Sequence, residues 1–329
     1  MGHFKQINFI QGNELRRLPV EKRPRESAST LFTDQNALHL TDTEHGRLQI
    51  SRYHVGTMTI AEVASTGHDV TVSEVAGATL LVPVRGRILS ETRRNAMEAA
   101  SGEIMFFSPN SRRTRVERFG DDDFLAIPLI IPVVELRKAA ERNGFGRTFL
   151  RQLGDFSVRL RACDHPEVAE LIGLTRILYD EVKRGSPRLA RLEAHVSWVD
   201  LITDKAVEVL AVAQTAKSPS GGAADQTARR ARDFMFEHYA EIETLADVAQ
   251  HCGVSLRTLQ QRFRSDMGLS PHKALTDIRL DASRRYLLSG DPRVNVTEAA
   301  MGSGFSHLGR FAAAYAKKYG ELPSATLYR

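Results

Sequence analysis

The chain has 329 residues, of which 42% are hydrophobic and 26% charged, and its formal net charge is +5. This length allows two domains with separate cores, and the composition is that of an ordinary globular protein. No run of eighteen apolar residues and no N-terminal apolar core with a cleavage site occurs, so we expect a cytoplasmic protein without a membrane span. Cys163 and Cys252 fall in different predicted domains and are expected to be reduced rather than bridged.

The first 40 residues carry little periodicity, and the basic segment from Arg16 to Arg25 is interpreted as a solvated arm. Alternating apolar residues then predict short strands. They are expected at 48–53, 58–63, 70–75, 79–89 (with a turn and a returning strand after Gly86), 103–109 and 124–131. Many short strands at regular spacing predict a small β-sandwich or barrel.

Helical patterns follow at 132–143, at 166–182 and, opened by Pro187, as far as Gln214. The apolar stripe of the last helix is long enough to pack on the barrel and on a second copy of itself. From the pattern alone, a dimer and an intramolecular helical hairpin are equally compatible with it. The segment 217–226, rich in Gly, Ser and Ala, is the clearest linker in the chain.

Two helix-turn-helix patterns occupy the last third of the chain. The first starts at Thr244, with Asp247 in the capping position, turns at Gly253 and restarts at Ser255. In its second helix we expect Leu256, Leu259 and Phe263 to face the core and the long hydrogen-bond donors to face outward. Such donors on an exposed helix suit the DNA major groove.

The second pattern begins at Val296, and its second helix places Leu308, Phe311 and Tyr315 inward and Arg310, Ala313 and Lys317 outward. A helix from Ser270 to about Leu288 joins the two units. This spacing predicts two recognition helices about 34 Å apart, one turn of a duplex. An ordinary helical bundle is the alternative, which the repeated motif disfavours.

These motifs resemble the AraC/XylS family of transcriptional regulators. The resemblance is carried by the first helix-turn-helix, Arg279-Leu280, Gly304-Phe305 and the closing Lys317–Pro323. Ser101-Gly102-Glu103 and Ser108-Pro109-Asn110 resemble more loosely the family's cupin-like effector domain. The resemblance implies an α+β protein: a cupin-like β-barrel or sandwich with packed helices (1–160), a helical dimerisation segment (161–216), the linker (217–226) and an all-α DNA-binding domain (227–329). It also implies promoter DNA, RNA polymerase and a second copy of the chain as partners, with no membrane, and an activator as the expected function.

Ten residues are the predicted DNA contacts: Ser255, Arg257, Thr258, Gln260, Gln261, Arg264, His307, Arg310, Lys317 and Lys318. The second unit departs from the family, which commonly has an arginine where Ala313 stands. We therefore expect the second unit to rely more on thymine methyl groups and on DNA shape.

Arginines crowd the predicted strands, and five of them are predicted to bind an anionic effector at the barrel mouth: Arg85, Arg87, Arg112, Arg113 and Arg115. Forked guanidinium groups suit carboxylates and phosphates. The expected effector is an aromatic or aliphatic acid, or a nucleotide such as a cyclic dinucleotide. A solvated β surface is the alternative interpretation.

A cupin-like metalloenzyme fused to a helical module is the second hypothesis for function. Metal-dependent cupin chemistry needs histidines alternating on one strand with a carboxylate nearby. His39, His45, His54 and His68 are scattered, with no His-x-His, and no nucleophile elbow, P-loop or dinucleotide fingerprint occurs. The sequence therefore predicts no catalytic residue, metal or cofactor.

Overall fold

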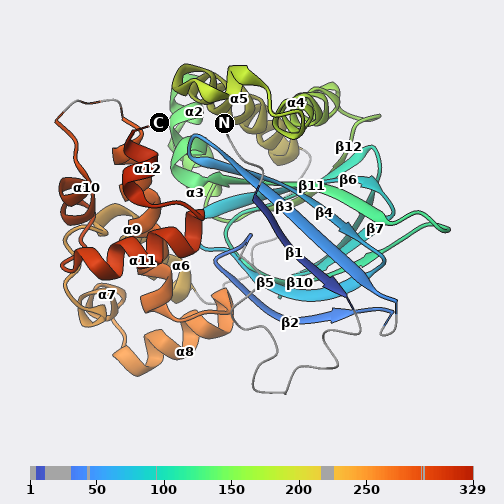
Figure 1. Ribbon diagram of the computed structural model, residues 1–329. Helices are drawn as coiled ribbons and strands as arrows, with labels where there is room; N and C mark the ends of the chain where they lie inside the picture. The colour runs from blue at the N-terminus through green and yellow to red at the C-terminus, as the bar shows by residue number, and fades with distance from the viewer. Residues whose placement is uncertain are drawn as a thin grey trace.

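Two antiparallel β-sheets form the N-terminal part of the chain (Figure 1). The computed structural model describes residues 5–11, 31–42, 45–93, 95–215, 226–289, 291 and 293–328. The first sheet has the order β1 (Lys5–Gln11), β3 (Arg47–Val55), β4 (Met58–Ser65), β11 (Phe124–Pro132), β6 (Gly77–Arg85), β9 (Glu103–Phe107) and β12 (Ser157–Arg161). The second has the order β2 (Asp34–Leu40), β5 (His68–Ser73), β10 (Ser111–Glu117), β7 (Arg87–Glu91) and β8 (Ala96–Ala100).

The turn at Gly86 carries the chain from one sheet to the other. Its φ is +79°, and a Cβ at this position would lie 2.4 Å from the Glu117 carbonyl oxygen, so only glycine fits without rearrangement. The predicted returning strand is therefore wrong in its pairing: β7 pairs with β10 and β8, not with β6. The apolar pattern located both strands but could not show that they belong to different sheets.

Among the described residues, the sequence does not predict five of the strands, namely β1, β2, β8, β10 and β12. Strand β10 shows why. Its inward positions hold Arg112, Thr114 and Val116, so polar residues stand where the alternation rule expects apolar ones.

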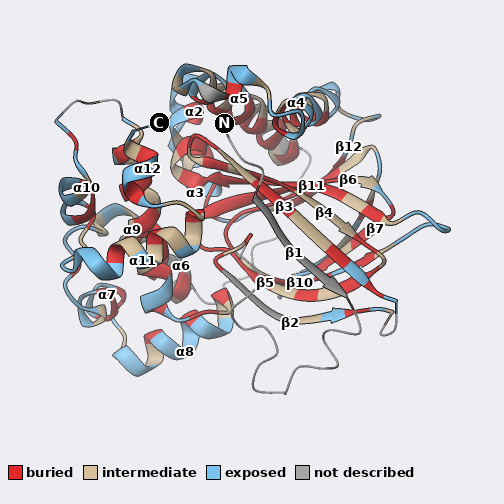
Figure 2. Ribbon diagram, in the orientation of Figure 1, coloured by how far each residue is buried: buried red, intermediate tan, exposed pale blue. Residues whose placement is uncertain are grey.

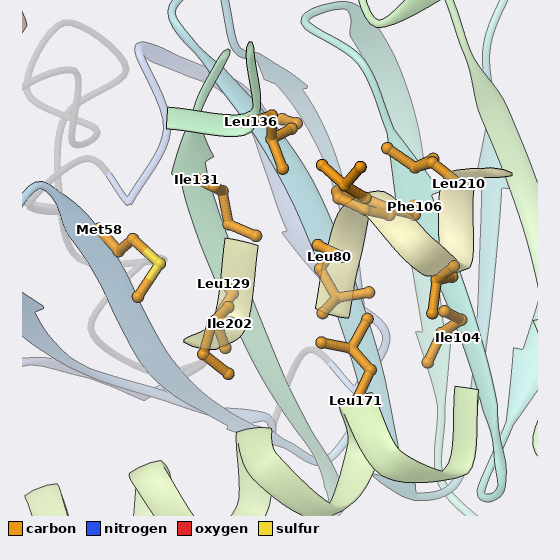
Figure 3. Packing of buried hydrophobic residues seen from close by; sticks show 14 of the residues in the cluster. Met58, Leu80, Ile104, Phe106, Leu129, Ile131, Leu136, Leu171, Ile202 and Leu210 are labelled. Carbon is orange, nitrogen blue, oxygen red and sulfur yellow. The ribbon is translucent and has the colours of Figure 1, made fainter. Parts of the chain in front are cut away.

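Helices cover the outer face of the first sheet. They are α2 (Val133–Arg142), α3 (Arg147–Gln152), α4 (Pro166–Lys183), the 3₁₀ helix η2 (Pro187–Ala190) and α5 (Leu192–Thr215). Leu80, Phe106 and Leu129 from the sheet meet Leu171 and Ile202 from the helices in one buried core (Figure 3). A single helix from Pro187 is wrong, because Arg191 is extended (φ −99°, ψ 136°) and separates η2 from α5.

In the described part of the C-terminal domain there are seven helices, so the predicted α+β fold with a terminal helical domain is confirmed. They are α6 (Gln226–His238), α7 (Leu245–Cys252), α8 (Leu256–Met267), α9 (Pro271–Leu287), α10 (Val296–Gly302), α11 (Leu308–Tyr319) and α12 (Pro323–Leu327). Within the described residues, no helix is long and apolar enough to cross a bilayer. The predicted linker and the basic arm at 16–25 lie outside the described residues, except for Gln226.

Helix α9 contributes to two separate cores. Ala274, Leu275 and Ile278 pack with α6, α7 and α8, whereas Leu280 and Leu287 pack with α10, α11 and α12. Each helix-turn-helix unit therefore has its own hydrophobic core, and the two are joined rigidly through one helix.

The helical domain lies directly against the β-domain (Figure 1). Val75 and Ala76, between β5 and β6, are part of the first helix-turn-helix core. The buried Arg232 of α6 donates to the carbonyl oxygen of Gly154 at 2.9 Å. At the end of α8, Gly268 is so close to the β-domain that a Cβ would lie 2.3 Å from Ser73 Oγ.

Candidate nucleic-acid interface and effector site

Local hydrogen bonds fix the ends of the first helix-turn-helix. The Thr244 backbone N–H donates to Asp247 Oδ2 at 2.8 Å, as predicted for a capping box. Gly253 has the left-handed φ of +68° that ends α7, and Ser255 Oγ accepts the Thr258 N–H at 3.1 Å to begin α8.

The outer face of α8 carries the predicted donors. Arg257, Gln260, Gln261 and Arg264 are exposed (Figure 2), Ser255 is exposed at the helix start, and Thr258 is half-buried. Leu259 and Phe263 are buried as expected. The inward placement of Leu256 is wrong: it is 40% exposed, because the first residue of α8 projects beyond the core.

The second unit repeats this arrangement with fewer donors. Asn295 Oδ1 accepts the Glu298 N–H at 2.9 Å, and α11 buries Phe311 and Tyr315. His307, Arg310, Ala313 and Lys317 are exposed. Leu308 is also 44% exposed, which contradicts its predicted inward position and adds an apolar side chain to this outer face.

Lys318 is the exception among the predicted DNA contacts. Its Nζ lies 2.8 Å from Asp277 Oδ2 and 2.6 Å from Asp281 Oδ1. Burial alone would lower the pKa of this ammonium, but the two carboxylates raise it above its usual range. In this conformation the Lys318 ammonium faces the domain interface and is not available to a phosphate.

Arg279 ties the two units together, which the motif did not reveal. Its Nε donates to the Tyr239 carbonyl oxygen at 2.8 Å and its Nη2 to that of Ile242 at 2.5 Å. A Cβ at Gly304, where φ is +84°, would lie 2.8 Å from Arg279 Nε. An arginine inside the linking helix was the only sequence signal for this role.

The structure does not bring the five predicted effector arginines together. Arg113 and Arg115 face outward on β10, and both contact Asp69 Oδ2, at 2.6 and 3.4 Å. The hydrogen bond from Arg113 is the main reason that the pKa of Asp69 lies below its usual value. Arg85 and Arg87 are also paired on the surface, with carboxylates of Asp122, Glu98 and Glu117.

Arg112 alone faces the interior, where it is 2% exposed. Its guanidinium carbon lies 5.1 Å from the Phe32 ring centroid and 4.7 Å from that of Phe107. Nη1 donates to Asn110 Oδ1 at 3.0 Å, whereas Nε and Nη2 have no hydrogen-bond partner among the described residues. Burial lowers the pKa of Arg112 to about 10. A buried cation with open donors is an arrangement suited to holding an anion.

Comparisons with known proteins agree with this geometry. A helix-turn-helix domain family model matches residues 248–329. The chain is 26% identical to the XylDLEGF operon transcriptional activator 1 of Pseudomonas putida over 251 residues, which cover 75% of this chain and 74% of that one. The C-terminal part of the chain is an AraC-type helix-turn-helix domain, and the chain resembles transcriptional regulators of the AraC/XylS family.

Two further relatives differ in how much of the chain they match. The probable thc operon regulatory protein of Rhodococcus erythropolis is 41% identical over 100 residues, only 30% of either chain. The crystal structure of the AraC-like transcriptional activator CuxR shares the fold, with a TM-score of 0.50 and 18% identity over 81% of this chain and 90% of that one. These relatives are transcriptional regulators, so the DNA-binding interpretation is confirmed at the level of the family.

Proposed function

We propose that this protein is a sequence-specific transcriptional activator controlled by a small anionic effector that binds in the N-terminal β-domain. The observation that carries the DNA-binding part is the pair of outward-facing helices α8 and α11, held by one rigid helix, α9. Arg257 and Gln261 at the exposed start of α8 are placed to read base edges, and Arg310 and Lys317 supply the contacts of the second unit. Its relative from Pseudomonas putida is an activator, which favours activation here.

Arg112 supports the effector part of the proposal. Leaving the N–H groups of a buried guanidinium unpaired costs about 1–3 kcal/mol, or more because the group is charged. A carboxylate or phosphate that accepts from Nε and Nη2 would remove this cost. The Phe32 and Phe107 rings beside the guanidinium add apolar and aromatic surface for the rest of the effector. The candidate classes are aromatic or aliphatic acids and nucleotides, including cyclic dinucleotides.

The proposal includes a homodimer and a division of the chain into four segments, 1–160, 161–216, 217–226 and 227–329. Ile177 of α4 and Val196 and Leu201 of α5 are 54, 51 and 46% exposed, so the helical segment presents apolar side chains that a second copy would cover. Promoter activation also implies contact with RNA polymerase.

Selection from a random duplex library with the full chain tests the DNA-binding part. We expect a consensus with two subsites about one helical turn apart. Promoter fragments bearing that consensus, fused to a reporter, then test the direction of regulation. An unenriched library after selection at low salt would refute sequence-specific binding.

A further inference from the structure

A cluster of buried carboxyl groups joins the β-domain to the DNA-binding domain. Glu74, between β5 and β6, and Thr33, before β2, come from the β-domain, while Asp277 comes from α9. All three side chains are buried. Thr33 Oγ1 lies 3.1 Å from Glu74 Oε1 and also 3.1 Å from Asp277 Oδ2. One hydroxyl therefore bridges two carboxyl groups that belong to different domains.

The hydrogen count at this bridge requires an additional proton. A threonine hydroxyl carries one hydrogen and can donate to only one of the two carboxyl groups. If both were ionised, the second contact would place two oxygen lone-pair regions 3.1 Å apart in a buried site. A proton on either carboxyl removes this conflict, because that group then donates to Thr33 Oγ1.

The charges that surround the bridge do not supply this balance. Lys318 contacts Asp277 and Asp281 and acts on Glu74 through its charge, so three carboxyl groups share one ammonium. Tyr319 donates to Asp281 and is flanked by the His54 ring and by the Arg284 guanidinium. The buried Arg112 also interacts with the charge of Glu74.

We propose that Glu74 and Asp277 share a single proton through the Thr33 hydroxyl, and so form a pH-sensitive latch that holds the DNA-binding domain against the β-domain. While the latch is closed, Lys318 stays in the interface with Asp277 and Asp281. Loss of the proton leaves two buried negative charges on opposite sides of the interface, which favours separation of the domains.

The raised pKa values of Glu74 and Asp277 set the direction of the pH effect. Burial, and then the Asp277 charge, raise the pKa of Glu74 to about 7 in the closed form. Burial likewise raises the pKa of Asp277, with Asp281 adding to the effect and Lys318 opposing it. The three backbone N–H groups of Val75, Ala76 and Gly77 that donate to Glu74 Oε1 favour its ionised form, so the proton is assigned to the pair and not to one residue.

In an open form both carboxyl groups face water and recover ordinary pKa values. The closed form therefore binds one proton more than the open form. The free-energy preference for the closed form is fully present below the ordinary carboxyl pKa. It is lost as the pH rises towards about 7, the raised pKa of Glu74 in the closed form. Between about pH 5 and 7 the ratio of open to closed molecules should rise by up to about tenfold per pH unit.

Spin-label distance measurements on the full chain test the latch without DNA or effector. One label is placed on the exposed Cys163 of the β-domain and the other at H272C on the exposed start of α9, in a background in which Cys252 is replaced by Ala. We expect one short distance at pH 5.5 and a growing longer-distance population up to pH 8. E74Q removes the negative charge of Glu74 at every pH, so this variant should stay closed across the range.

D277N replaces the carboxyl group on the other side of the interface with an amide. This variant tests the proposal if E74Q fails to fold. E98Q removes a surface carboxylate on β8, paired with Arg87, and should keep the wild-type pH dependence. A distance distribution in the wild type that does not change with pH would overturn the proposal. So would amide variants that open with pH as the wild type does. Sequence-specific DNA binding is measured separately at fixed pH, so the latch and the proposed function can fail independently.

Discussion

The Arg284 guanidinium of α9 donates from Nε to the carbonyl oxygen of Gly56, 3.2 Å away in the turn between β3 and β4. The N–H of the same glycine donates to His195 Nδ1 at 3.1 Å, and His195 Nε2 contacts the Leu189 carbonyl oxygen at 2.7 Å. One peptide turn thus connects α5 with the second helix-turn-helix core. Because His195 Nδ1 accepts a hydrogen, Nε2 carries the proton and the imidazole is neutral in this arrangement.

Replacing Arg284 with Met should lower the free energy of unfolding by about 3 kcal/mol, since it removes a buried guanidinium from its hydrogen-bond and ion-pair partners. These partners are the Gly56 carbonyl and Glu321, whose carboxylate lies 2.9 Å from Arg284 Nη1. Urea unfolding followed by circular dichroism measures the change. R285M, at the adjacent and only half-buried arginine, is the matched control and should change stability by less than about 1 kcal/mol. Equal losses in the two variants would contradict the importance of this contact.

Arg257 and Gln261 should each contribute to reading one base position. Alanine at either residue is expected to cost about 1–3 kcal/mol of binding to the selected operator and to relax the preference at that position. Titration of labelled duplexes carrying single base changes measures both effects. R161A, an exposed arginine on β12 far from α8, should leave affinity and preference unchanged. The assignment fails if both helix variants keep the wild-type preference at every position.

Arg112 should be dispensable for folding but required for the effector. Its open donors make the apo site unfavourable, so R112M is expected to leave the melting temperature unchanged or to raise it. Thermal-shift screening against carboxylic acids and nucleotides should then identify ligands that stabilise the wild type but not R112M. R113M alters the next residue, which is paired with Asp69 on the surface, and should respond to the ligand as the wild type does. If R112M is stabilised by the ligand as strongly as the wild type, the effector does not bind at Arg112.

Residues 227–329 should fold alone as a helical domain, because both helix-turn-helix cores lie almost entirely within this fragment. Removal of Val75 and Ala76 from the first core should reduce its stability without preventing folding. The fragment should bind operator DNA more weakly than the full chain, since it lacks the effective concentration that a dimer provides. Circular dichroism and DNA titration of the fragment check these points. A fragment without cooperative melting would show that the boundary is wrong.

Sequence patterns predicted the elements whose signals are local. Thr244, Gly253 and Ser255 define the first motif through caps and a turn that act within a few residues, and the structure places them as expected. Strands with apolar alternation were found for the same reason. Strand β10 was missed because a buried arginine and a buried threonine replace the apolar residues of its inner face.

Contacts between distant segments could not be predicted in this way. Thr33 and Asp277 are 244 residues apart, and nothing in either neighbourhood indicates the other. The motif implies an exposed helix and predicts that Lys318 contacts DNA, but the Lys318 ammonium pairs with Asp277 and Asp281 of α9. Leu256 and Leu308 are predicted to be buried but are exposed, because helical spacing alone does not show where the core ends.

The participation of α9 in two cores constrains the DNA as well as the protein. A helix of 17 residues packed at both ends cannot lengthen or twist to follow a displaced subsite. Inserting about five base pairs between the subsites would rotate one of them by half a turn, to the far side of the duplex. Promoters under this regulator can therefore exchange bases within a subsite at modest cost, whereas insertions or deletions between the subsites should be eliminated by selection.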